Sequence, residues 1–429
     1  MFILLLVALG AYLYPKYDAR IAFAGIFLLI DLACWKAFIS FTKTLKPLLS
    51  VILRVWYWLP MVFLTLFFLI SIFLSIQFWP SFLRVYLPGI MVVLYLGKFL
   101  YISLFLLGEL LLLPVNIINA IRRMIASHGW TRFRFFSWMG LFLAFISNLI
   151  LFSGFVFWIY DFKVVEIELP VKNLPKSFDG YRIVHLSDIH LGSWTSRQTL
   201  QKAVDQINKA NPDVVLFTGD MVNYATSEAW RFQSTLEGIK TRDGAFSILG
   251  NHDYGDYVNW DSPEAKDFNN RELAAFYHVM GWHLLKNESF IIQHGNDSLA
   301  IIGVENWSRS KLWGRKGDLP KAREKAGLNS VKILLSHDPT HWSYEVIKTH
   351  PDIILTLSGH THGMQLGILD SEIKWSPASM LFPEWGGLYN STKSGELQYL
   401  YVNTGLGHLG IPARILLRPE ITVLVLKRQ

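Results

Sequence analysis

The stretch IVHLSDIH, residues 183–190, decides the fold of the second half of this chain. Its first four residues are apolar apart from one histidine, and the polar residues Asp188 and His190 follow almost directly. A short apolar or β-branched run that is closed by Gly or Asp is typical of a buried strand rather than a helix. The stretch therefore predicts a strand whose carboxyl end carries two side chains able to bind a ligand.

The same pattern recurs in four other apolar runs, at residues 214–218, 245–249, 332–336 and 353–357. The motifs that close these runs are, in order, Gly219-Asp220, Gly250-Asn251-His252-Asp253, His337 and Gly359-His360-Thr361-His362. In open α/β sheets, ligands collect at the carboxyl ends of the strands. We therefore expect these strand ends, which are rich in Asp, Asn and His, to converge on one site.

The residue types at these strand ends are ligands of divalent metals such as Mn, Fe and Zn. Asp188 and His190 are separated by one residue, as are His360 and His362, and alternate residues at the end of a strand can both turn towards one ion. A lone histidine is usually a satisfied structural residue, but two such pairs beside Gly-Asp and Gly-Asn-His-Asp motifs are not explained by chance. The neighbouring glycines allow tight turns that bring the backbone close to a ligand.

The full set of motifs, in this order, resembles the calcineurin-like metallophosphoesterase superfamily over residues 181 to about 410, and within it the membrane-anchored bacterial phosphohydrolases. Gly363-Met364-Gln365 and residues 403–407 carry the closer likeness, although such relatives often have Gly where this chain has Met364. The resemblance implies an α/β metallophosphoesterase domain with two packed β-sheets flanked by helices. It also implies a metal-dependent phosphoric ester hydrolase.

The resemblance assigns a role to each motif residue. It implies that one metal ion is held by Asp188, His190, Asp220 and His362, and a second by Asp220, Asn251, His337 and His360, with Asp220 bridging them. Two such ions generate hydroxide at neutral pH and clamp the phosphate oxygens during an in-line displacement. His252 would protonate the leaving group or stabilise the transition state, and Asp253 would orient His252.

Residues 1–160 are expected to form an α-helical transmembrane domain, ahead of the metallophosphoesterase domain at 161–429. Apolar residues make up 52% of the chain and there are 16 tryptophans, which is typical of a membrane protein. Four stretches are long enough for a membrane span, namely residues 21–41, 56–79, 86–113 and 137–160, and residues 2–14 form a marginal fifth. The single cysteine, Cys34, excludes an intrachain disulfide.

The distribution of charge predicts which side of the membrane the catalytic domain faces. Residues 1–160 carry 12 Lys and Arg against 3 Asp and Glu, whereas the remainder carries 28 against 30. The segment 114–136 holds four arginines and no acidic residue, and the segment 42–55 holds three basic residues. The positive-inside rule places both segments in the cytoplasm. The domain after residue 161 is then extracytoplasmic, and we expect a bacterial inner or plasma membrane.

Charged residues within the expected spans allow two interpretations. Lys98 and Glu109 are 11 residues apart and so lie nearly on one face of a helix. They could line a polar track inside the bundle, but snorkelling and helix–helix pairing are the favoured interpretation. A transporter or sensor with an accessory phosphoesterase domain is therefore an alternative that rests on the membrane half alone.

The substrate is less constrained by the sequence. Trp375, Met380, Leu381, Phe382 and Trp385 lie close in sequence to the last histidine motif, and are either core residues or a membrane-facing lip. Tethering to the membrane favours a lipid-linked phosphate or pyrophosphate, for which the related UDP-diacylglucosamine hydrolases give an analogy. A phosphodiesterase acting on soluble nucleotides is the alternative. Despite the basic pI of about 9.2, no basic and aromatic module favours nucleic-acid binding.

The other histidines are expected to be structural. His185 lies within a predicted strand and should belong to the core, and His408 is a candidate to reach the site. His283, His341 and His350 are expected at the surface or in loops.

Overall fold

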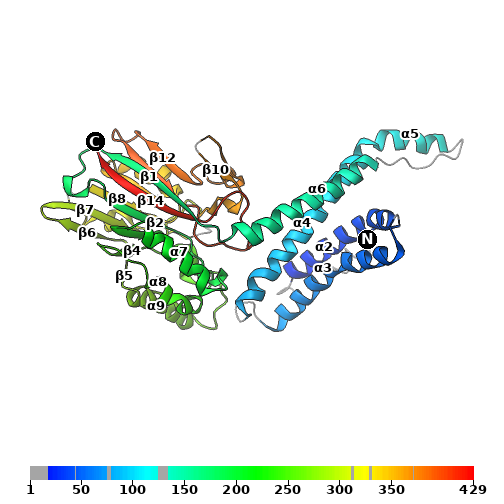
Figure 1. The fold of residues 1–429 in the computed structure, drawn as a ribbon, viewed down its shortest axis with the longest axis horizontal. Helices are drawn as coiled ribbons and strands as arrows, with labels where there is room; N and C mark the ends of the chain where they lie inside the picture. The colour runs from blue at the N-terminus through cyan, green and yellow to red at the C-terminus, as the bar shows by residue number, and fades with distance from the viewer. Residues whose placement is uncertain are drawn as a thin grey trace. The chain divides into compact units, whose positions relative to one another are not determined.

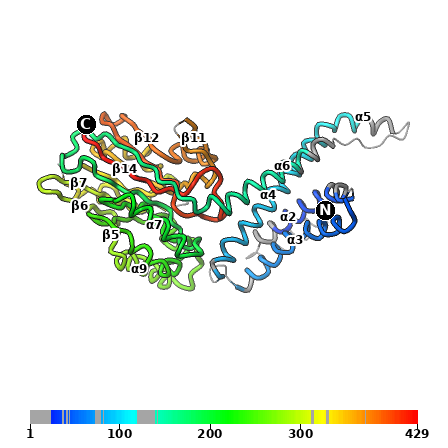
Figure 2. Tube along the Cα trace, in the orientation of Figure 1, coloured from blue at the N-terminus to red at the C-terminus, as the bar shows by residue number. Residues whose placement is uncertain are grey.

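The computed structural model describes residues 18–43, 45–74, 79–123, 134–310, 314–327, 331–370 and 372–429 (Figure 1, Figure 2). The chain divides into two compact units, Met1–Ser153 and Gly154–Gln429. The expected marginal span at residues 2–14 lies outside the described residues, as does most of the arginine-rich segment that follows residue 123.

Helices make up the described part of the first unit. They are α2 (Asp18–Thr42), α3 (Pro47–Phe73), α4 (Ser81–Leu111), α5 (Leu113–Arg123) and α6 (Arg134–Ser153). Among the described residues, two stretches are long and apolar enough to cross a membrane, Pro47–Ser71 in α3 and Phe82–Leu111 in α4. The apolar parts of the other two expected spans, Ala24–Trp35 and Phe142–Trp158, are helical but shorter.

A buried ion pair joins two of these helices. Lys98 in α4 donates a hydrogen bond to the carboxylate of Asp31 in α2, whose side chain is fully buried. The hydroxyl of Tyr95 donates to the other oxygen of Asp31 at 2.9 Å, and Lys98 also donates to the carbonyl of Tyr57 at 3.1 Å. Charges in an apolar bundle persist when they are paired in this way. Lys98 therefore takes part in helix–helix pairing, which is the interpretation that the sequence favoured.

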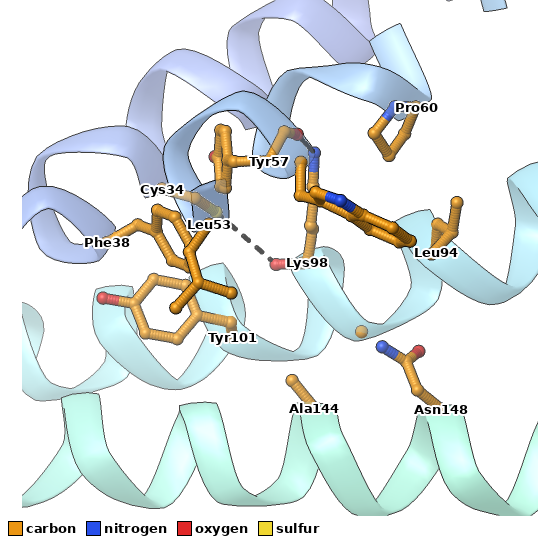
Figure 3. A pocket seen from close by; sticks show the side chains of 12 residues that line it. Cys34, Phe38, Leu53, Tyr57, Pro60, Leu94, Lys98, Tyr101, Ala144 and Asn148 are labelled. Carbon is orange, nitrogen blue, oxygen red and sulfur yellow. Dashed lines mark hydrogen bonds between the residues drawn. The ribbon is translucent and has the colours of Figure 1, made fainter. Parts of the chain in front are cut away.

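A pocket of about 290 Å³ adjoins this ion pair within the first unit (Figure 3). Its walls come from α2, α3, α4 and α6 and are mostly apolar or aromatic, including Phe38, Leu53 and Leu94. Polar groups at its wall include those of Lys98, Asn148 and Tyr101, which Figure 3 labels. The pocket is therefore an apolar cavity with a charged edge.

We expect Asp31→Ala to destabilise the helical unit, because it leaves the Lys98 ammonium buried without its counter-charge. Removing one partner of a buried pair typically costs about 3–5 kcal/mol. The midpoint of thermal unfolding of the full-length protein in detergent measures the effect. The matched control is the double variant Asp31→Ala with Lys98→Met, which removes both charges and should recover most of the loss. Equal midpoints for the single and double variants would contradict the pairing.

Two six-stranded sheets form the second unit, as the sequence predicts for the catalytic domain. The first sheet has the order β1 (Lys163–Val171), β14 (Glu420–Arg428), β2 (Arg182–Leu186), β3 (Val214–Phe217), β4 (Ala245–Ser247) and β5 (Trp282–Leu284). The second has the order β12 (Gly387–Ser391), β13 (Gln398–Val402), β9 (Ile353–Ser358), β8 (Val331–Leu335), β7 (Asp297–Gly303) and β6 (Glu288–His294). A short hairpin pairs β10 (Ile368–Leu369) with β11 (Lys374–Trp375).

Successive side chains along a strand alternate between the two faces of its sheet, and apolar side chains are buried on both faces. In β2, Ile183 packs into the cluster that also holds Ile333 and Leu355 of the second sheet, whereas Val184 belongs to a different cluster with Leu200. Successive side chains of a strand point to opposite faces, so both faces of β2 are covered. Helices α7 (Arg197–Lys209), α8 (Gln233–Leu236), α9 (Pro263–Val279), α10 (Leu319–Arg323) and α11 (Ile347–Thr349) complete the unit.

The parallel pairing of the central strands positions the site. β2, β3 and β4 are parallel to one another, and so are β8 and β9, so their carboxyl ends gather the motifs that the sequence singled out. β14 runs antiparallel to β2 and pairs with β1 on its other side. Strand β1, which follows the last apolar helix, is thereby paired with β14, the last strand of the described chain.

Candidate metal centre

The backbone turns sharply at the candidate ligands. Five of them have positive φ: Asp188 (52°), His190 (48°), Asp220 (60°), His360 (71°) and His362 (50°). Residues with a Cβ rarely adopt this region, and each instance costs of order 1–3 kcal/mol that the surrounding structure must offset. The turns aim side chains from three strand ends, those of β2, β3 and β9, back over the edge of the sheets, where they meet.

One cluster contains three buried residues, Asp188, His190 and His362, whose candidate ligand atoms all lie within 4.8 Å of one another. His362 Nε2 is 3.2 Å from Asp188 Oδ1 and 3.1 Å from His190 Nε2. Carboxylate oxygens and imidazole nitrogens that converge in this way form a donor set for a divalent ion of intermediate hardness. The arrangement fits the first ion site that the resemblance implies.

A second cluster contains Asp188, Asp220 and His337 within the same distance limit. Asn251 Oδ1 lies 3.2 Å from His337 Nε2, and His360 Nδ1 lies 3.3 Å from that same nitrogen. His337 Nδ1 is 2.8 Å from the carbonyl oxygen of Thr218, so its N–H points away and Nε2 faces the cluster. Metal-binding histidines are commonly oriented by such a hydrogen bond from the other ring nitrogen.

Asp220 belongs to the second cluster and also approaches the first, with which the second cluster shares Asp188. Its Oδ2 is 3.5 Å from His190 Nε2 and 3.3 Å from His337 Nε2, which belong to different clusters. Burial alone would lower the pKa of His337, but the carboxylate of Asp220 outweighs burial and raises that pKa to about 10. The carboxylates of Asp220 and Asp188 thus stabilise a positive charge beside His337, and a bound metal cation would carry such a charge.

The backbone around the clusters is held by Asp253. Its Oδ1 accepts hydrogen bonds from the backbone N–H groups of Met221 (2.9 Å) and Val222 (3.2 Å), and its Oδ2 from those of Asp220 (2.8 Å) and Gly250 (2.9 Å). Asp253 was expected to orient His252, and these hydrogen bonds run to backbone N–H groups instead of to its ring. Both residues lie in the 3₁₀ turn Asn251–Tyr254, where neighbouring side chains point about 120° apart, so Asp253 faces the core instead.

His252 is oriented by other groups. Its Nδ1 is 2.8 Å from the carbonyl oxygen of Asn223, and its backbone N–H donates to Asp220 Oδ1 at 2.9 Å. The ring packs edge-on against His190, with 5.0 Å between ring centroids. Because Nδ1–H is committed to Asn223, Nε2 is the ring nitrogen that is left available for proton transfer. His252 thus sits beside the first cluster with one ring nitrogen free for chemistry.

Tyr257 was not predicted from the sequence, because an aromatic residue in a loop carries no motif. Its ring stacks on His252 with 4.4 Å between centroids. Its hydroxyl accepts a hydrogen bond from Asn251 Nδ2 at 2.8 Å. An asparagine amide can turn over, and this bond fixes the orientation in which Oδ1 faces His337. Tyr257 therefore positions one candidate ligand and supports His252.

Asp338 is a second residue that the motifs did not reveal. It is fully buried, accepts a hydrogen bond from Ser308 Oγ at 2.5 Å, and lies 3.8 Å from His360 Nε2. A carboxylate behind a ligating histidine orients the ring and raises its basicity. Its position directly after His337 was the available signal in the sequence.

The histidines outside the motifs divide between core and surface. His185 is fully buried, with Nε2 2.9 Å from Thr218 Oγ1, as expected of a core residue. His283 is exposed, as expected. His341 was expected at the surface or in a loop but is helical and fully buried, where its ring stacks on Trp307 and its Nδ1 pairs with Ser336 Oγ.

Two further histidines are also buried. His350 is only 9% exposed, and Arg323 donates a hydrogen bond to its Nδ1 at 2.8 Å. His408, a candidate to reach the site, is fully buried and packs edge-on against Tyr160.

The apolar stretch after the last motif divides into two parts. Phe382 and Trp385 are 7% and 2% exposed, and the ring of Phe382 packs edge-on against His360. In contrast, Trp375, Met380 and Leu381 are 52%, 87% and 61% exposed. The core interpretation is therefore right for the first pair of residues and wrong for the other three.

Comparison with known proteins identifies the class of this domain. Residues 181–364 match the family model of the calcineurin-like phosphoesterases. The chain therefore contains a calcineurin-like metallophosphoesterase domain, which confirms the resemblance seen in the motifs.

Three relatives place this domain in context. The chain is 36% identical over 273 residues to a transmembrane protein with metallophosphoesterase domain from Danio rerio, which covers 62% of this chain and 57% of that protein. It is 28% identical over 262 residues to the uncharacterized metallophosphoesterase YkuE of Bacillus subtilis, covering 59% of this chain and 82% of that protein. It is also 28% identical over 279 residues to the UDP-2,3-diacylglucosamine pyrophosphatase LpxG of Chlamydia muridarum, covering 54% and 81%.

We expect Tyr257→Phe to weaken metal binding, because the amide of Asn251 is then free to turn its nitrogen towards the metal. Loss of an outer partner of a ligand typically costs about 10-fold or more in metal affinity. Titration of the metal-free protein with Mn²⁺ or Zn²⁺ against a competing chelator measures this affinity. Tyr344→Phe, at an exposed tyrosine whose ring lies against Arg309 and Lys348, is the matched control. Unchanged affinity in Tyr257→Phe would show that the hydroxyl does not set the amide.

Proposed function

We propose that this protein is a membrane-anchored phosphoesterase that uses two divalent metal ions to hydrolyse a phosphate ester or pyrophosphate. The observation that carries the proposal is the position of Asp220 Oδ2, within 3.5 Å of a histidine nitrogen from each cluster. The ligands would be Asp188, His190, Asp220, Asn251, His337, His360 and His362, and their oxygen and nitrogen donors suit Mn, Fe or Zn.

In this proposal, Asp220 and His252 have different roles around the reacting phosphate. When bound, the two ions would supply a hydroxide nucleophile and neutralise charge on the phosphate oxygens. Asp220 holds the clusters together through Oδ2, while its Oδ1 accepts the backbone N–H of His252. That bond keeps His252 beside the reacting centre. Its imidazolium form delivers the Nε2 proton to the leaving oxygen, while Nδ1–H remains bonded to Asn223.

We expect Asp220→Asn and His252→Ala to abolish or strongly reduce hydrolysis for different reasons. Asp220→Asn removes the charge shared by both clusters, so at least one ion should be lost along with activity. His252→Ala removes a proton donor that is not a ligand, so turnover should fall by about 100-fold or more while metal content stays near that of the unaltered protein. Metal analysis and hydrolysis of a chromogenic phosphoester, both on the same preparation, check the two outcomes.

Either of two results would contradict this division of roles. Full activity of Asp220→Asn, or full activity with one bound ion, would overturn the binuclear mechanism. A metal-free His252→Ala protein would show that His252 is a ligand rather than the proton donor.

The substrate that we favour is a lipid-linked phosphate or pyrophosphate. Two observations support it: the apolar helical unit ahead of the domain, and the likeness to a relative named as a diacylglucosamine pyrophosphatase. A panel of monoester, diester, soluble nucleotide and lipid pyrophosphate, each with Mn, Zn and Mg, tests the preference. Faster hydrolysis of a soluble nucleotide than of any lipid substrate would favour the phosphodiesterase alternative.

We further infer that the metallophosphoesterase domain lies outside the cytoplasm, because segment 114–136 holds four arginines and no acidic residue. Alkaline phosphatase fused after Gln429 should therefore be active in intact bacterial cells, since that enzyme folds only after export. The same reporter fused after residue 129, within the arginine-rich segment, should be inactive and serves as the matched control. The reverse pattern would place the domain in the cytoplasm.

A further inference from the structure

Six exposed apolar side chains gather on three segments of the second unit. Their exposed fractions are Met364 45%, Ile373 52%, Trp375 52%, Met380 87%, Leu381 61% and Leu416 57%, and we call this surface the apolar tip. Single exposed apolar residues are common, but a group of large ones marks a surface that binds something apolar.

Hydrogen bonds hold the three segments together. Ile415 donates its backbone N–H to the carbonyl of Gln365 at 2.8 Å and accepts from Gly367 at 3.1 Å. Ser376 Oγ donates to the carbonyl of Gly363 at 2.7 Å, and Trp375 pairs with Ile368 in the β10–β11 hairpin. The apolar tip is therefore a fixed surface rather than a set of independent loop ends.

The segment that carries Leu416 is also bonded to the chain that leaves the last apolar helix. The backbone N–H of Arg414 donates to the carbonyl of Gly154 at 3.4 Å. The guanidinium of Arg418 donates to the carbonyl of Asp161 at 3.0 Å and to its carboxylate at 2.6 Å. Leu416 thus lies between two anchors on residues 154–161.

The residues between these anchors are themselves exposed and apolar. Gly154–Trp158 form a π-helical turn in which Val156 and Phe157 are 50% and 67% exposed, and they end the apolar stretch Phe142–Trp158. Such residues at the end of an apolar helix belong at a membrane interface. The exposed basic residues Lys163 and Arg418 follow at the same place, where cations can reach lipid headgroups.

We propose that the apolar tip inserts into the interfacial layer of the lipid bilayer that surrounds the helix ending at Trp158. A bilayer is favoured over a protein partner because the hydrogen bonds of Arg414 and Arg418 fix the tip beside the apolar turn at 154–158. Met364 is two residues from the candidate ligand His362, so insertion places the metal centre next to the membrane surface. The inference rests on the proposed membrane anchoring and narrows the proposed substrate class to lipids presented at that surface.

Site-specific labelling of the full-length protein tests the insertion without relying on hydrolysis. The background is Cys34→Ser, which removes the single cysteine, and single cysteines are then introduced as Met380→Cys, Leu381→Cys, Asn296→Cys and Phe157→Cys. Asn296 is an exposed residue in the turn between β6 and β7 and serves as the control in water, and Phe157 reports on the anchor. Each protein carries a fluorescent label and is reconstituted into vesicles of phosphatidylethanolamine and phosphatidylglycerol.

Quenching by lipids with brominated acyl chains should be at least about twofold stronger for labels at residues 380 and 381 than at residue 296, since an interfacial apolar surface is buried about 5–10 Å. Quenching by iodide in the water should show the opposite order. As a second variant, Met380→Asp with Leu381→Asp should lower hydrolysis of a lipid pyrophosphate while leaving hydrolysis of a soluble phosphoester unchanged.

Three outcomes would overturn the inference, each in a different way. Equal quenching by brominated lipids at residues 380 and 296, with strong quenching at residue 157, would show that the apolar tip is not inserted although the protein is anchored in the membrane. Weak lipid quenching at residue 157 as well overturns the anchoring together with the tip. Shielding of residue 380 from iodide without lipid quenching, and with cross-linking between copies, identifies a second copy of the chain as the occupant.

Discussion

The carboxylate of Asp253 holds four backbone N–H groups that belong to two different loops. One loop carries Asp220 and the other carries Asn251. The side chain of Asp253 therefore holds together two loops that supply candidate metal ligands. Each hydrogen bond from a backbone N–H to this buried carboxyl group contributes roughly 1 kcal/mol to stability. They help offset the cost of the left-handed backbone at Asp220, which the clusters require because its carboxylate must reach both of them. The geometry of the site thus depends on a residue that faces away from it.

The sequence predicts the site well because its chemistry is local. Each candidate ligand lies one to five residues after the end of an apolar run. Because the strands formed by these runs are parallel, the residues that follow them lie at the same edge of the sheet. Helix α7 likewise carries its signal within its own residues, since Leu200, Val204 and Ile207 are buried at helical spacing and Ser196 accepts the N–H of Thr199 as the cap. In both cases the residues that carry the signal lie close together in the chain.

Contacts between distant segments were beyond the reach of the sequence. Adjacency suggested that Asp253 serves His252, whereas the 3₁₀ turn separates them and a carbonyl 29 residues away takes that role. Tyr257 belongs to the site through stacking and one hydroxyl, which no periodicity reveals. The stretch from Trp375 to Trp385 divides between core and surface because it contains a hairpin strand and a short turn, not one regular element.

The order of the first sheet sets when this domain can assemble during synthesis. β14 lies between β1 and β2, so both strands lack their neighbour until residues 420–428 have been made. All seven candidate ligands precede that point in the chain, yet the sheet edge that carries Asp188 and His190 stays unpaired on one side until then. Translation therefore delivers the ligands well before it delivers the strand that completes their support. A ribosome-bound chain of this protein therefore holds all seven candidate ligands while its first sheet is still incomplete.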